Sequence, residues 1–202
     1  MNPAQVIADT LHRHLQERTE LVVFGAAALL LDHRFAERMV GRLTHDIDII
    51  VPETRELQVN TDRQFWHALE VTNRELERKK LYITHIFPEN EVTLTPEWKQ
   101  HTVALLNPQW PKLNLIRPHV LDLIVSKMGR GDVEDQADVR SMLRLHRDVE
   151  GQTITAAEVA AAAQRARVPE VYRELFPRAS AQIIAAVREA EITIRSGPRM
   201  GL

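Results

Sequence analysis

Two patterns of hydrophobic residues alternate along the first half of the chain. A helix over residues 4–18 is predicted by apolar side chains that recur at helical spacing: Val6, Ile7, Leu11 and Leu15. The short apolar run LVVFG, residues 21–25, predicts a buried strand that ends at a glycine. The segment AAALLLDHR then predicts a helix that begins directly after this glycine.

The same alternation continues through a second strand. DIDIIV, residues 46–51, is apolar at every second position and is closed by Pro52, so it predicts a strand. Residues 61–73 have a helical spacing of apolar residues. LYITHIF and EVTLT flank the turn-forming residues PEN, and together they predict a hairpin.

The pattern changes near residue 107. NPQWPKLNLIRP contains three prolines and has no helical period, so it predicts a connection. Helices are predicted beyond it, the last with room for a break near Pro177, over residues 119–128, 133–147, 155–167 and 171–194. We therefore expect an α/β (α+β) domain over residues 1–108 and a helical region over residues 109–202.

Composition limits the kinds of site, partner and cellular location that are expected. The 202 residues include no cysteine, which excludes disulfides and thiolate metal sites, and the net charge of −2 gives no global case for nucleic-acid binding. No segment approaches the roughly 20 apolar residues of a membrane span, so no membrane partner is expected. The N-terminus has an amphipathic helical pattern rather than that of a signal peptide, which favours a cytoplasmic location.

Two aspartates in the second strand are the first candidates for chemistry. Side chains alternate between the faces of a strand, so Asp46 and Asp48 share one face while Ile47 and Ile49 share the other. Two carboxylates this close repel each other unless a proton or cation lies between them, and oxygen ligands favour Mg²⁺. The alternative is a half-exposed strand whose polar face simply carries aspartates.

The second candidate is the glycine between the first strand and the helix that follows. Gly25 would let a ligand approach the backbone closely, and the N–H groups of a helix N-terminus suit a phosphate. The alternative is a tight turn without a ligand.

The two features together resemble the signature of a known superfamily. FGAAALLLDHRFAERMVGRLTHDIDIIV resembles the DNA-polymerase-β-like nucleotidyltransferases. Its R-x-T-x-D-I-D form (Arg42, Thr44, Asp46 and Asp48) is similar to the toxin and abortive-infection (AbiEii-like) branch. The resemblance implies a mixed sheet flanked by helices, with two Mg²⁺ ions at the aspartates. It also implies nucleotide contacts from four further positions: Gly25, Ala26, Arg42 and Thr44.

The sequence departs from this signature twice. Alanine follows Gly25 where a second glycine or a serine is usual, so a hydroxyl contact to phosphate is missing. The strand LYITHIF lacks the third carboxylate that many members carry. Alternation predicts one face with Ile83, His85 and Phe87, and His85 could replace the missing ligand or act as a base. Two glutamates near the expected turn are further candidates: Glu89 and Glu91.

A third segment resembles the helical part of the same branch. RPHVLDLIVSKMGRGDVEDQADVRSMLR contains a lysine before an acidic D-x-x-D helix, here Lys127, Asp135 and Asp138. The resemblance implies that Lys127 contacts phosphate and that Asp138 orients the lysine or the nucleotide. Helix capping by acids in the first turn is the alternative for Asp135.

The basic run RELERKK, residues 74–80, has two interpretations. Such a run is usually a solvated helix end, and the alternative is the lining of a groove for the acceptor.

The expected function is transfer of a nucleotidyl group from a nucleoside triphosphate (NTP) to an RNA acceptor, for example tRNA, or to a protein acceptor. Mg²⁺ is the expected cofactor. The branch resemblance implies a role in phage defence or in a toxin–antitoxin pair with an antitoxin partner. The alternative is an inactive module of the same fold that senses nucleotide or binds a partner protein.

Overall fold

The computed structural model of the chain describes residues 2–39 and 44–196, and the chain divides into two compact units. The sheet unit comprises Met1–Val92 and Lys99–His119. The helical unit comprises Thr93–Trp98 and Val120–Leu202. Among the described residues, no helix is both long and apolar enough to cross a membrane.

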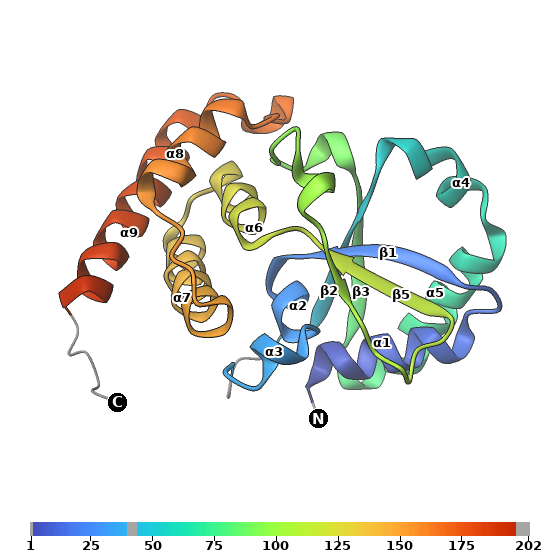
Figure 1. Ribbon diagram of the computed structural model, residues 1–202. Coiled ribbons are helices and arrows are strands. Elements are labelled where there is room, and N and C mark those ends of the chain that lie inside the picture. The colour runs from blue at the N-terminus through green and yellow to red at the C-terminus, as the bar shows by residue number, and fades with distance from the viewer. Residues whose placement is uncertain (1, 40–43, 197–202) are drawn as a thin grey trace. The chain divides into compact units, whose positions relative to one another are not determined.

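The sheet unit is built on a mixed five-stranded sheet of order β3-β2-β1-β5-β4 (Figure 1). β1 is antiparallel to β2 and parallel to β5, while β2 is parallel to β3 and β4 is antiparallel to β5. The strands are β1 (Thr19–Phe24), β2 (Asp46–Val51), β3 (Tyr82–Pro88), β4 (Val103–Leu105) and β5 (Leu113–Arg117).

Helices α1 and α5 pack against each other, and they also contact β2 and β3 respectively (Figure 1). Asparagine and aspartate side chains cap their N-termini, Asn2 on α1 and Asp62 on α5, and each accepts a backbone N–H of the first turn. The helices of this unit are α1 (Pro3–His14), α2 (Gly25–Leu30), α3 (His33–Ala36), α4 (Glu56–Thr61) and α5 (Arg63–Leu76).

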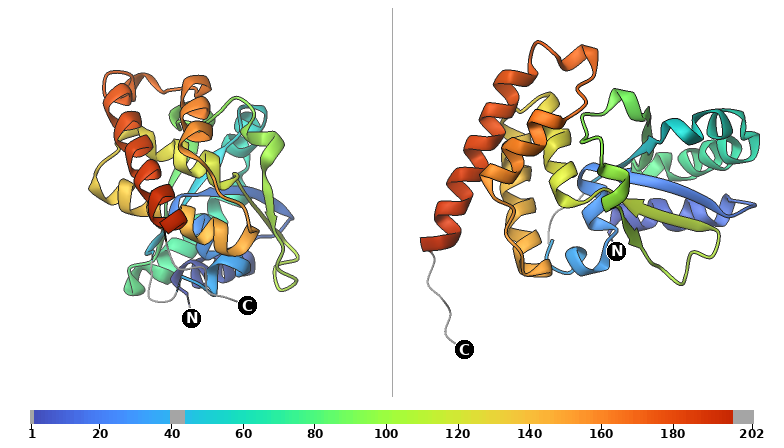
Figure 2. Two further views of the ribbon diagram at one scale, coloured as in Figure 1. Left: turned by 60° about the vertical axis from the view of Figure 1, so that its left-hand side comes forward. Right: turned by 45° about the horizontal axis from the view of Figure 1, so that its top comes forward.

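The helical unit contains α6 (Val120–Ser126), α7 (Val133–Glu150), α8 (Ala156–Arg165) and α9 (Phe176–Ser196). Figure 2 shows α9 running alongside α7 and α8, and it contacts both. Thr155 and Glu158 form a capping box that starts α8. Short 3-10 turns complete the structure: Glu53–Arg55, Glu77–Lys79, Glu89–Glu91, Trp98–His101, Lys127–Gly129 and Glu170–Tyr172.

The predicted fold class is confirmed, and the strand over residues 46–51 is confirmed to the residue. The predicted hairpin is wrong. β3 pairs in parallel with β2, and the segment after β3 joins the helical unit, where Leu94 pairs with Arg167 and Thr95 donates to Asp122.

The predicted connection around residues 107–118 contains the strand β5, which pairs with the central strand β1. Its prolines flank a segment of alternating burial, Leu113–Arg117, that is too short to show a period on its own. Trp110 anchors the preceding turn, because its Nε1 donates to Asp9 at 2.6 Å. The expected division after residue 108 therefore falls inside the sheet unit, which continues to His119.

A buried ion pair joins the end of β5 to the start of α3. The guanidinium of Arg117 donates from Nε and Nη2 to Oδ2 of Asp32, at 3.1 and 2.9 Å, and both side chains are almost fully buried. Arg34, which is more exposed, donates to the same carboxylate. Asp32 also caps α3, so this pair fixes the segment that follows the glycine turn.

Candidate active site

Asp46 and Asp48 lie on one face of β2, as alternation predicted. Both are partly accessible, whereas Ile47 and Ile49 are buried in the core. The strand thus uses its apolar positions for packing and presents two carboxylates two residues apart on its other face.

Thr44, directly before β2, holds the first of these carboxylates. Its hydroxyl donates to Oδ1 of Asp46 at 2.8 Å. This bond fixes one oxygen of the carboxylate, so Thr44 orients the side chain of Asp46. Arg42, the other residue predicted in this segment, lies outside the described residues.

The second carboxylate is held from β3. Nδ1 of His85 lies 3.2 Å from Oδ1 of Asp48, and the Thr84 hydroxyl donates to the same oxygen at 3.4 Å. The β2–β3 register shifts between Ile47 and Asp48, so Ile83 faces Ile47 and His85 faces Asp48. The predicted common face for Ile83 and His85 is wrong, because this bulge buries Ile83 and exposes both Thr84 and His85.

The environment of Asp48 favours neutralisation of its charge. Burial raises the pKa of Asp48, and the nearby charge of Asp46 raises it further. Hydrogen bonds from His85 and Thr84 lower it in part. A bound cation would offset the unfavourable burial of this negative charge without protonation of the carboxylate.

Asp46 and Asp48 are the two carboxylates of this face, and among the described residues no group of three potential ligands gathers to bind a metal. Glu89 is buried, and it accepts from the backbone N–H of Glu53 at 3.0 Å and from Lys99 at 2.6 Å. It follows His85 by four residues, about 13 Å along the strand direction, and Glu91 lies in the same 3-10 turn as Glu89. The pair nevertheless fits Mg²⁺, which commonly takes one or two carboxylates and completes its shell with substrate phosphates and water.

The glycine turn lies against the second aspartate. Phe24 pairs with Asp48 in the sheet, and Gly25 follows with φ of +67°. A Cβ atom at Gly25 would lie 3.6 Å from Oδ2 of Asp48, so the missing side chain leaves the backbone open beside the carboxylate. α2 starts at this glycine, with Ala26 as its second residue, and its N-cap makes no side-chain hydrogen bond.

Three aromatic rings share this face of the sheet: Phe24, His85 and Phe87. The sequence alone did not indicate that they lie together. The ring of Phe87 packs edge-on against Phe24, with centroids 5.6 Å apart, and stacks on His85 at 5.1 Å. The signal was present in the alternation of His85 and Phe87, but their relation to Phe24 depends on strand order.

Lys127 lies in a charged cluster of the helical unit. Its Nζ is 2.9 Å from Oδ1 of Asp135 and 2.9 Å from Oδ2 of Asp138, and Arg130 donates to Asp135 at 3.2 Å. Burial lowers the pKa of Lys127, but hydrogen bonds to Asp138 and Asp135 outweigh it and raise the pKa overall. Asp132 caps α7 by accepting the backbone N–H of Asp135, and Asp135 lies in the first turn of the helix.

A mixed sheet with paired strand aspartates beside a glycine turn has the arrangement expected of a nucleotidyltransferase. Residues 5–156 match the family described as "Nucleotidyltransferase of unknown function (DUF6036)". The match covers well over half of the chain, so the chain belongs to this family. No curated protein and no solved structure matches the chain. The predicted superfamily is thereby supported, while its toxin-like branch stays a prediction.

Proposed function

We propose that the protein is a metal-dependent nucleotidyltransferase that transfers a nucleotidyl group from an NTP to a hydroxyl group of an RNA or protein acceptor. The observation that carries the proposal is the position of Gly25 beside Asp48, on the strand that also presents Asp46. A cation held by the two carboxylates would neutralise the charge of a phosphate chain bound at the glycine backbone.

Asp46 and Asp48 would hold Mg²⁺ at this position. Bound there, Mg²⁺ supplies charge neutralisation for the triphosphate and activation of the attacking oxygen. The residues of the chain prepare the site for it. Thr44 fixes Oδ1 of Asp46, and His85 and Thr84 fix Oδ1 of Asp48, so both carboxylates are oriented in the absence of substrate.

The nucleotide would be positioned mainly by backbone groups. α2 begins at Gly25 and Ala26, and no side chain caps its N-terminus. A phosphate would therefore not have to displace a capping side chain from these amides. Arg42 and Lys127 stay predicted phosphate contacts, on the strength of the resemblance. Asp138, which bonds to Lys127, is proposed to orient the lysine.

A cellular role in phage defence or in a toxin–antitoxin pair, with an antitoxin partner, also follows from the branch resemblance alone. Expression in a bacterial host tests it. Growth arrest that requires Asp46 and is relieved by the neighbouring gene product would support this role, and unimpaired growth at high expression would count against it.

A second candidate function is a nucleotide-sensing module without transferase activity. It is favoured by the absence of a third acidic ligand among the described residues and by alanine after Gly25. Such a module would bind NTP at the same place and release it unchanged.

The experiment is label transfer from each α-labelled NTP, with Mg²⁺, to total RNA and to a protein extract. Wild type is compared with Asp46→Asn, Asp48→Asn and the exposed control Asp148→Asn. We expect at least a roughly 100-fold loss for the first two and none for the control. Transfer that persists in both would refute the assignment of the aspartates. NTP binding without any transfer would establish the sensing module.

A further inference from the structure

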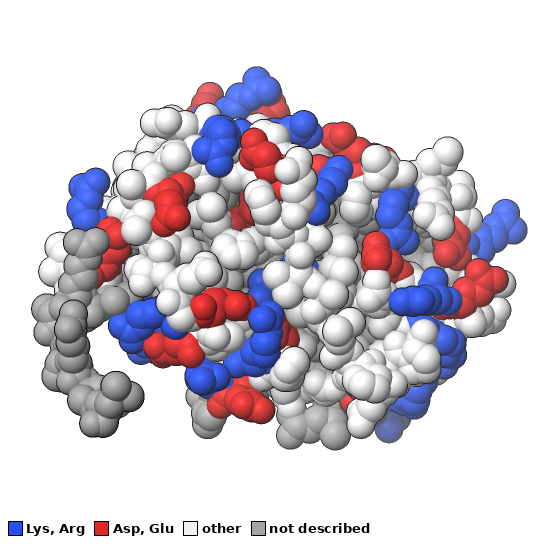
Figure 3. All heavy atoms as spheres, in the orientation of Figure 1, with Lys and Arg blue, Asp and Glu red and all other residues white. Residues whose placement is uncertain are grey.

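The turn between α5 and β3 carries three consecutive cations. Arg78, Lys79 and Lys80 are all exposed, and we call them the basic turn. Within the described part of the chain, none of the three makes an ion pair or side-chain hydrogen bond. Lys, Arg, Asp and Glu side chains are interspersed over the face shown in Figure 3, whereas residues 78–80 are three consecutive cations in the sequence.

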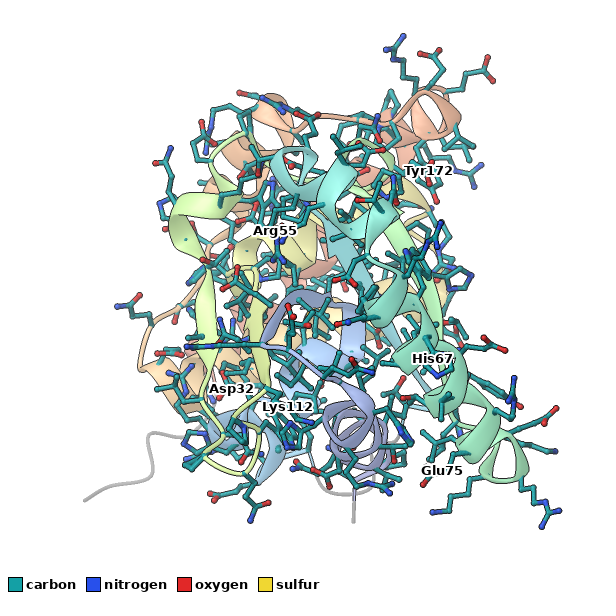
Figure 4. All side chains as sticks on the ribbon, turned by 90° about the vertical axis from the view of Figure 1, so that its right-hand side faces the viewer. Asp32, Arg55, His67, Glu75, Lys112 and Tyr172 are labelled. Atoms are coloured by element: carbon teal, nitrogen blue, oxygen red, sulfur yellow. The ribbon has the colours of Figure 1, made fainter. Side chains whose placement is uncertain are left out.

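The acidic neighbours of the basic turn are mostly engaged elsewhere. Glu75 pairs with Arg13 at 2.7 Å and with His14 at 2.8 Å, and Figure 4 shows it near the end of α5. Glu70 pairs with Arg74 on the same helix. Glu77 precedes the basic turn directly in the sequence, and residues 77–80 together carry a net positive charge.

The backbone of the turn is strained at Lys80. This residue ends the 3-10 turn with φ of 54° and ψ of 41°, and it is the one non-glycine residue with positive φ in the described chain. Leu81 N–H then donates back to Leu76, which is the hydrogen-bond pattern of a helix end that favours glycine. A lysine costs about 1 kcal/mol more than glycine in this conformation.

The basic turn lies at the end of the sheet where Asp46 begins β2. Tyr82 pairs with Asp46, and its backbone N–H donates to His45 at 3.0 Å. Lys80 precedes Tyr82 by two residues, so its backbone lies within about 10 Å of the Asp46 backbone. A flexible lysine or arginine side chain can span much of that distance.

Exposed aromatic surface lies on β3, the strand that follows the basic turn. The side chain of His85 is 60% exposed and stacks on Phe87. Cations that contact phosphates, together with aromatic faces that accept bases, are the two components of single-strand nucleic-acid binding.

We propose that the basic turn binds the phosphate backbone of a single-stranded RNA end, and so guides its terminal hydroxyl towards Asp46 and Asp48. This inference rests on the proposed function and chooses RNA over protein as the acceptor. Three adjacent exposed cations can contact several phosphates, and each contact releases a counterion from the RNA.

The test is fluorescence anisotropy of a labelled single-stranded RNA of about 20 nucleotides with the full chain, over a series of salt concentrations and without NTP. Arg78→Gln/Lys79→Gln should weaken binding at least tenfold at low salt and reduce the slope of log K against log salt by about 1.4. Arg18→Gln/Arg63→Gln removes the same charge from exposed positions, Arg18 before β1 and Arg63 at the far end of α5, and should leave binding nearly unchanged.

Lys80→Gly separates binding from folding. It should reduce the magnitude of the slope of log K against log salt by about 0.7, because one cation is lost. It should also raise the midpoint of thermal unfolding, because glycine relieves the backbone strain. Equal binding by the basic-turn variants and the control would overturn the proposal, as would labelling of protein but not RNA. Since binding is measured without NTP, the inference and the proposed function can fail separately. RNA binding that depends on the basic turn would support the inference even if no variant transfers label, and label transfer by a protein whose RNA binding does not depend on the basic turn would overturn the inference alone.

Discussion

Asp48 and His85 face each other across β2 and β3, with Oδ1 of the aspartate 3.2 Å from Nδ1 of the histidine. The other oxygen of the same carboxylate, Oδ2, faces the glycine turn at Gly25. The two oxygens of Asp48 are therefore used differently. One is held by the neighbouring strand, and the other is directed to where the phosphate chain is proposed to bind.

His85 is expected to act as a positioning residue for this carboxylate. His85→Ala should lower the rate of label transfer by about tenfold, the value of one hydrogen bond to a charged group. His85→Asn should restore part of the rate, because its amide can donate from a position close to that of Nδ1. Thermal unfolding should change little, since the side chain is exposed. Equal rates for the two variants would contradict this role.

Gly25→Ala should impair the site as well as the fold. Its positive φ makes any side chain cost about 1–2 kcal/mol, and the new methyl group would also lie against Asp48. Gly151→Ala is the matched control, because its φ is +69° and nothing lies within 4 Å of the added atom. Both variants should lose similar stability in urea titrations. Only Gly25→Ala should weaken NTP binding, and equal binding by both would rule out a special role for Gly25.

Asp48→Asn should be more stable than the wild type at neutral pH. The folded protein raises the pKa of Asp48, through burial and then through Asp46, so the folded state holds this proton more tightly than the unfolded state. The contribution of Asp48 to stability therefore falls as pH rises from the unfolded value of 3.8 through the folded pKa. The stability gap between variant and wild type, measured by urea titration, should widen over that interval and then stay constant. Addition of Mg²⁺ should narrow it by stabilising the wild type, and a gap independent of both pH and Mg²⁺ would contradict the prediction.

Arg117→Met should cost about 3 kcal/mol of unfolding free energy, because it leaves the carboxylate of Asp32 buried without its buried partner. Arg34→Ala, at the more exposed partner, should cost less than about 1 kcal/mol.

Burial raises the pKa of Asp32, but hydrogen bonds from Arg34 and Arg117 outweigh it and hold the pKa below its usual value. Wild type should thus lose this stabilisation as pH falls from 3.8 through the folded pKa, and Arg117→Met should lose less. Similar costs for both variants in urea titrations would contradict the assignment.

Lys127→Met should also destabilise the fold by about 3 kcal/mol, since Asp135 is 1% exposed and would lose its closest cation. Asp138→Asn should cost clearly less in the same urea titrations, because Asp138 is more accessible and Lys127 keeps Asp135. A larger loss of unfolding free energy for Asp138→Asn than for Lys127→Met would contradict this ranking.

The sequence was most informative where a feature depends on neighbouring residues alone. Strand β2 and the placement of Asp46 and Asp48 on one face follow from alternation within six residues. The contact of Asp138 with Lys127 agrees with what the resemblance implied, whereas the contact of Asp135 with the same lysine was not predicted.

Features that depend on how distant segments pair could not be predicted. The bulge that turns both Thr84 and His85 outward arises from the register of β2 against β3, which neither strand encodes by itself. The pairing of β5 with β1 joins segments about 90 residues apart. The pair of Asp32 and Arg117 likewise looks like two unrelated charges in the sequence, because 85 residues separate them.

The parallel pairing of β2 with β3 has a consequence for how the site is assembled. Two parallel neighbours require the chain to travel back along the whole sheet between them, and α5 makes that return. The final turn of α5 therefore sets where the next strand starts. The length of this one helix acts as a spacer, and lengthening or shortening it would displace the basic turn and His85 together relative to Asp48.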